Sequence, residues 1–162
     1  MNNDGTLAGF SYKFGTAEHI RHISRLNTPW GEGVVFADHG VDNVELNQGG
    51  KILLIVKNKI TGKLEDLSFK LKLERNYSFN VVTPKRAGIP YNDILVIPYN
   101  SDSSRPVYLQ AMSNGYVDSS KLLPVDWRNK SVCFMTGITL DFNHSGTDDV
   151  FLGGCDQDIK MN

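Results

Sequence analysis

Strict alternation of apolar and polar residues is the feature of this chain that most constrains its fold. Residues 67–73 read LSFKLKL, with leucine or phenylalanine at every second position. A period of two places all of these apolar side chains on one face of a β-strand. The apolar run KILLIVKN (51–58) precedes this segment, and KITGK (59–63) joins the two, with Gly62 suited to a left-handed turn. The pattern predicts a β-hairpin.

Further short segments of strand character follow at close intervals. Clusters of glycine, proline and asparagine separate them, as is typical of antiparallel sandwiches and barrels. Pro98 lacks a backbone N–H donor, so its strand is expected to end there or to lie at a sheet edge. We therefore predict an all-β, mainly antiparallel fold, a β-sandwich or jelly-roll-like domain, with additional strands at 10–14, 77–83, 93–99, 106–112, 131–136 and 138–142.

One segment has helical rather than alternating spacing. In TAEHIRHISRL (16–26), Thr16 can serve as an N-cap, and Ile20 and Ile23 share one face only in a helix. This predicts one short helix near residues 17–26. His19 and His22 would then lie on one face of that helix, where an acidic third ligand could complete a metal site.

Length and composition indicate an ordinary globular chain. The 162 residues, 40% hydrophobic and 22% charged, suit one β-rich domain spanning residues 1–162. No apolar run approaches the roughly 20 residues that a membrane-spanning helix needs. Two cysteines, Cys133 and Cys155, are too few for a disulfide scaffold. The N-terminus lacks the features of a signal peptide, so we expect a cytoplasmic or virion-associated protein, or one released by a non-classical route.

Charge is unevenly distributed along the chain, although the net charge is only −1. Residues 51–86 carry nine basic and three acidic side chains, whereas residues 87–162 carry five and nine. A basic block can attract nucleic acid or anionic lipid. Lysines on the open side of strands also simply solvate a sheet, and we therefore regard nucleic acid as an unlikely partner.

Motifs for catalysis are absent from the sequence. It contains no G-x-S-x-G nucleophile elbow, no phosphate-binding glycine loop, no G-x-G-x-x-G and no H-E-x-x-H. We predict a non-enzymatic protein with no catalytic residues and no cofactor.

Two similar stretches supply candidate ligand-binding residues. FADHGVDNVEL (36–46) and FNHSGTDDVFL (142–152) each place a histidine, a glycine and acidic residues between two strand-like segments. If both loops met at one end of a sandwich, they could bind a cation such as calcium or hydrogen-bond a sugar. The alternative is two turns that use the same Asx and glycine chemistry. The candidates are Asp38, His39, Asp42, Asn43, His144, Asp148 and Asp149.

The two tryptophans are the remaining candidates. Trp30 lies in NTPWGEG, and Trp127 lies in PVDWRNK beside charged and amide side chains. An exposed aromatic ring next to such groups can stack on a sugar while its neighbours bind the hydroxyls. Alternatively, each tryptophan caps one end of the core.

Three functional hypotheses follow. The first is a carbohydrate-binding, lectin-like module that binds a glycan through loops at one end of a β-sandwich. The second is a self-assembling structural subunit of a virion, tail or filament, present as a homo-oligomer. The third is a membrane- or nucleic-acid-binding protein that uses the 51–86 basic block.

Overall fold

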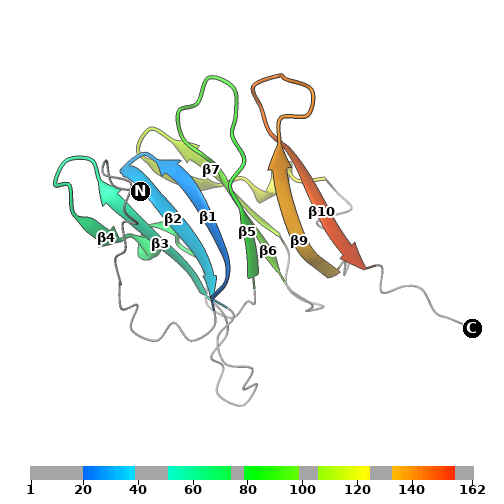
Figure 1. Ribbon diagram of the computed structural model, residues 1–162, viewed down its shortest axis with the longest axis horizontal. Helices are drawn as coiled ribbons and strands as arrows, with labels where there is room; N and C mark the ends of the chain where they lie inside the picture. Colours follow the sequence, from blue (N-terminus) through cyan, green and yellow to red (C-terminus); the bar gives the residue numbers. More distant parts are fainter. Residues whose placement is uncertain (1–19, 39–50, 74–78, 99–105, 125–132, 156–162) are drawn as a thin grey trace, which may run out of the picture.

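The structure is a computed structural model, and it describes residues 20–38, 51–73, 79–98, 106–124 and 133–155 (Figure 1). These residues form three small antiparallel sheets that do not close on one another. The predicted all-β, antiparallel class is confirmed. The strands are β1 (Ile20–Thr28), β2 (Gly31–Asp38), β3 (Lys51–Asn58), β4 (Leu64–Asp66), β5 (Phe79–Val82), β6 (Ile94–Pro98), β7 (Val107–Met112), β8 (Gly115–Asp118), β9 (Cys133–Leu140) and β10 (Asp149–Cys155).

The first sheet has the strand order β1-β2-β3-β4. A two-residue turn joins β1 to β2, and the Thr28 hydroxyl holds it by donating to the Gly31 carbonyl and accepting from the Trp30 and Gly31 backbone N–H groups. As predicted, residues 51–58 form the first strand of a hairpin with Gly62 in its turn, at φ +69°; its second strand, however, is β4 rather than residues 67–73.

The predicted helix near residues 17–26 is wrong, because residues 20–26 belong to β1. Residues 17–19, including His19, and the predicted strand at 10–14 lie outside the described residues. Alternate residues of β1 face inward from His22 onward, but most of them are polar, which conceals the period of two. Ser24, for example, shares a 2.9 Å hydrogen bond with Thr83. The three-residue spacing of Ile20 and Ile23 therefore does not mark one face of a helix.

The strand predicted at 67–73 is also wrong. β4 ends at Asp66, and residues Ser68–Leu71 form a 3-10 helix, η2. The Ser68 hydroxyl accepts from the Leu54 backbone N–H, and Asp66 accepts from the Ser68 backbone N–H at 2.9 Å. These bonds turn the chain inward, so that Leu67 and Leu71 are buried while Phe69 is exposed.

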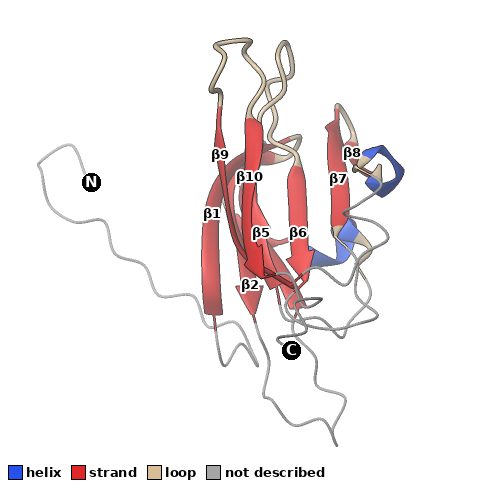
Figure 2. Ribbon diagram, turned by 90° about the vertical axis from the view of Figure 1, so that its right-hand side faces the viewer, coloured by secondary structure: helices blue, strands red, loops and turns tan. Residues whose placement is uncertain are grey.

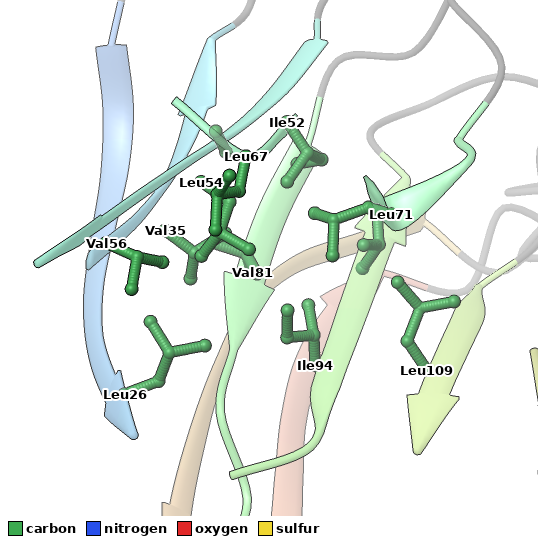
Figure 3. Packing of buried hydrophobic residues seen from close by; sticks show 12 residues of the cluster. Leu26, Val35, Ile52, Leu54, Val56, Leu67, Leu71, Val81, Ile94 and Leu109 are labelled. Carbon is green, nitrogen blue, oxygen red and sulfur yellow. The ribbon is translucent and has the colours of Figure 1, made fainter. Parts of the chain in front are cut away.

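The second sheet, β5-β6-β7-β8, is the middle layer. Ile94 and Val96 of β6 join the core that the second sheet shares with the first, whereas Leu95 and Ile97 pack in a second cluster with Val150 and Leu152 of β10. Burial on both faces explains the continuous apolar run ILVIP in this strand. Figure 3 shows the larger cluster, to which the first sheet contributes Leu26, Val35, Ile52, Leu54 and Val56.

The third layer is the hairpin β9–β10. Segments 131–136 and 138–142, predicted as two strands, belong largely to the single strand β9. The register places Cys133 opposite Cys155. Pro98, where this strand was expected to end, is the last described residue of β6 and pairs with Phe79 of β5. Figure 1 shows the first sheet on one flank of the molecule and the hairpin on the other, with β5 and β6 between them.

Candidate functional site

Trp30 packs against the larger core cluster at the turn between β1 and β2. Its ring lies 5.9 Å from that of Tyr116, and the Lys70 ammonium lies 4.6 Å from its centroid. A cation over an indole face stabilises both groups and occupies one of the two ring faces on which a sugar could stack. These contacts favour the role of a core cap for Trp30.

The β9–β10 loop and the first residue of β10 hold three of the predicted site residues. His144 is exposed, with φ +57°, and Asp149 begins β10. Asp148 accepts a hydrogen bond from the Lys85 backbone N–H, and its own N–H donates to the Lys85 carbonyl. Asp141 likewise accepts from the Ser145 and Gly146 backbone N–H groups. Asp141 and Asp148 therefore hold loops together, as the turn-chemistry alternative predicts.

The structure does not bring Asp38 together with Asp148 and Asp149. Asp38 ends β2 opposite Ile20 and Lys51, at the start of β1 and β3. The β9–β10 loop lies beside the loop after β5, at the other end of the strands, where Figure 2 shows the connecting loops gathered. The other predicted residues of this set, His39, Asp42 and Asn43, lie outside the described residues, as does Trp127.

Within the described ranges, no group of three or more His, Cys, Asp or Glu side chains is placed to hold a metal ion. His22, predicted to share a helix face with His19, lies in β1 instead. In the same part of the chain, no helix has the length and apolarity needed to cross a membrane.

A polar cleft of about 290 Å³ lies between β1, β2 and the loop after β5. Asn92, which is buried, lines this cleft, and its side chain accepts from the Asn27 backbone N–H and donates to the Thr83 carbonyl. At the mouth, Arg25 and Glu32 lie 3.5 Å apart and are both solvent-exposed. The lining residues are Arg25, Leu26, Asn27, Glu32, Lys85 and Asn92.

The second sheet contains a buried charged network centred on Asp93, which sequence reasoning missed. Asp93 is fully buried and accepts from Arg86 Nε at 2.6 Å, Arg86 Nη2 at 3.0 Å, the Tyr108 hydroxyl at 2.5 Å and the Ala111 backbone N–H at 2.7 Å. Burial raises the pKa of Tyr108 to about 12, and its hydrogen bond to Asp93 adds to the rise. The same carboxylate, as hydrogen-bond partner, raises the pKa of Arg86. The Asp93 carboxylate accepts four hydrogen bonds, so this network is suited to joining β6 and β7 rather than to moving protons.

Exposed apolar side chains gather on the outer face of the β9–β10 hairpin. Ile138, Leu140 and Phe151 point away from the second sheet, and Phe142 follows β9 with its ring 6.4 Å from that of Phe151. Their exposed fractions are 62%, 53%, 46% and 72% for Ile138, Leu140, Phe151 and Phe142. We call these four residues the hairpin face.

The opposite face of the hairpin explains this arrangement. Gly137 and Thr139 alternate with Ile138 and Leu140, and a Cβ added at Gly137 would lie 2.8 Å from Leu152 and 2.9 Å from Ile97. Only a glycine permits this close approach. Alternation alone predicts that the larger side chains of β9, Ile138 and Leu140, face inward. The structure instead buries the side of β9 that carries Gly137.

An apolar groove of about 210 Å³ lies on the outer face of the first sheet. Ile55 is buried at its base, and Leu64 of β4 is exposed at its side. Arg25 and Lys57 supply positive charge at its rim, with Glu32 beside Arg25. We call this the sheet groove; its lining residues are Arg25, Glu32, Gly33, Val34, Ile55, Lys57 and Leu64.

The two flanks differ in charge. Residues 20–38 and 51–73, which form the first sheet and η2, carry eight basic and four acidic side chains. Residues 133–155, which form the hairpin, carry three aspartates and no lysine or arginine. One flank therefore has a formal charge of +4 and the other −3.

Comparison of the chain with known protein families, with characterised proteins and with solved structures finds no match in any of the three.

Proposed function

We propose that this protein is a non-enzymatic structural subunit that assembles with copies of itself through the hairpin face. The observation that supports this is the cluster of Ile138, Leu140, Phe142 and Phe151 on one exposed surface. A contiguous apolar patch on a soluble protein marks an interaction site, because leaving it in water has a free-energy cost. Aromatic side chains such as Phe142 and Phe151 are also enriched in the cores of interfaces.

The architecture that we propose for this subunit is a β-sandwich. The first and second sheets share one apolar core, which supports that arrangement. The hairpin packs on the far side of the second sheet and keeps its outer face free for a partner.

Self-assembly is tested by sedimentation velocity across a concentration series, comparing the wild type with Phe142→Ser. Phe142 is 72% exposed, so the change should leave the fold intact while weakening association. Phe69→Ser is the matched control, because Phe69 is 73% exposed and lies in η2, outside the hairpin face. A wild-type protein that stays monomeric at its highest soluble concentration would refute the proposal. So would equal losses of association in the two variants.

Glycan binding at the polar cleft is the second candidate function. The guanidinium, carboxylate and amide groups of Arg25, Glu32 and Asn27 support it, since such groups bind sugar hydroxyls. The test is a glycan array with the wild type and Glu32→Gln. Binding that is lost in the variant would support this site, and an array without any binding would exclude it.

A further inference from the structure

We propose that the hairpin face of one copy docks into the sheet groove of the next copy, in a head-to-tail contact. This inference rests on the proposed self-assembly and identifies the partner surface. The two surfaces lie on opposite flanks of the molecule, separated by the second sheet (Figure 1). Each copy would therefore present one donor surface and one acceptor surface.

The sheet groove has room for one aromatic ring. An engineered apolar cavity of about 150 Å³ holds a benzene ring, and the sheet groove measures about 210 Å³. It can therefore admit the ring of Phe142 or Phe151. Docking there would cover the exposed side chain of Leu64 together with the hairpin face.

The charges favour this contact over pairing of two hairpin faces. Asp149 lies opposite Leu140 in the register, so it borders the hairpin face. Arg25, Lys57 and Glu32 border the sheet groove, which gives its lining a formal charge of +1. Head-to-tail docking brings opposite charges together, whereas two hairpin faces would bring the acidic flank of one copy against that of the other, which is unfavourable.

Geometry determines what this contact builds. A contact between two different surfaces leaves one free surface of each kind at the ends, so assembly continues into a ring or an open filament. Self-pairing of hairpin faces would instead stop at a two-fold dimer.

A complementation experiment distinguishes these modes. Ile138→Asp removes the hairpin face and keeps the groove, while Leu64→Asp removes the groove and keeps the hairpin face. Both positions are exposed, and circular dichroism of each variant should show the fold of the wild type. Each variant alone should be monomeric by sedimentation velocity. An equimolar mixture should form a complex with the mass of two chains and nothing larger, because each variant supplies the surface that the other lacks.

The outcomes separate the two proposals. If Leu64→Asp associates as well as the wild type and the mixture forms no heterodimer, the head-to-tail contact is overturned while self-assembly stands. If the wild type does not associate at all, both proposals fail. Lys57→Glu is a second groove variant, at an exposed side chain. It should weaken self-association of a chain whose hairpin face is unchanged, without affecting the fold. Unchanged association of Lys57→Glu would count against the groove as the acceptor.

Discussion

Asp93 shows how one residue can join several elements. Asp93 is fully buried, and its carboxylate accepts hydrogen bonds from Arg86, Tyr108 and the Ala111 backbone. Arg86 Nη2 also donates to the Ala111 carbonyl at 2.8 Å. A buried charge is tolerated because these donors replace the hydrogen bonds of water.

Asp93→Asn should strongly destabilise the protein. The amide accepts on one oxygen only and presents N–H donors to Arg86, which leaves the guanidinium without its counter-charge. We expect the free energy of unfolding, measured by urea denaturation, to fall by about 3–5 kcal/mol.

Glu32→Gln is the control for this prediction. Glu32 also pairs with an arginine, but its side chain is 71% exposed, so the loss should stay below about 1 kcal/mol. If both substitutions lowered the free energy of unfolding equally, the contribution of Asp93 to stability would not depend on its burial.

At the scale of elements, the β9–β10 hairpin is oriented by what its inner face can accommodate. Gly137 faces Val82 and Ile97 of the second sheet without space for a methyl group. Because the small side of β9 must face the second sheet, Ile138 and Leu140 face outward. The exposed hairpin face is thus a consequence of close packing on the other side of the same strand.

Gly137→Ala should lower stability despite the better strand propensity of alanine. The added Cβ would lie 2.8 Å from Leu152, 2.9 Å from Ile97 and 3.2 Å from Val82, so the hairpin must shift. Overpacking of this kind typically lowers the free energy of unfolding, measured by thermal or chemical denaturation, by about 1–3 kcal/mol.

The matched control is Gly153→Ala in β10. Its added Cβ would meet one atom, of the Thr136 side chain, at 3.2 Å on the exposed side. We expect a change within about 0.5 kcal/mol. A destabilisation by Gly153→Ala that matches that of Gly137→Ala would contradict this account of the hairpin.

At the scale of the whole molecule, charge is separated between the two flanks. The basic residues of the first sheet and η2 oppose the aspartates of the hairpin across the second sheet. In a head-to-tail assembly, this separation places unlike charges at every contact. The basic block at 51–86 would then serve association between copies.

Association should therefore weaken as ionic strength rises. The rim charges are solvent-exposed, and salt shortens the range of their attraction from about 10 Å at 0.1 M to about 3 Å at 1 M. The weight-average mass of the wild type at fixed concentration, measured by light scattering, should fall over this range. Lys57→Gln should flatten the dependence, whereas Lys121→Gln, in the 3-10 helix η3 (Ser120–Leu122), should leave it unchanged. Association that strengthens with salt in every variant would indicate a contact without a charged component.

Much of the strand content could be predicted from the sequence, and the failures have identifiable causes. Apolar runs such as residues 52–56 and 94–97 are strands whose side chains are almost all buried. β1 was missed because its inward residues include Ser24 and Thr28, whose hydroxyls are hydrogen-bonded. In residues 67–73, the alternation was overridden by the hydrogen bonds of Ser68 with Leu54 and Asp66, which accompany the end of β4.

The candidate site could be predicted less well. The loop at 141–148 was found as an Asx- and glycine-rich turn, but only the structure shows that Asp141 and Asp148 bind backbone groups. Asp93 gave no signal, because its partners Arg86 and Tyr108 come from separate segments.

Local chemistry in the sequence determined the β class, the turns and the segregation of charge, because these depend on neighbouring residues along the chain. The tertiary structure alone decided which face of each strand is buried. It thereby decided that Ile138 and Phe151 remain in solvent while Gly137 is enclosed. The physical reason is that burial depends on the space left by residues distant in the sequence, and in β9 that space fits a glycine.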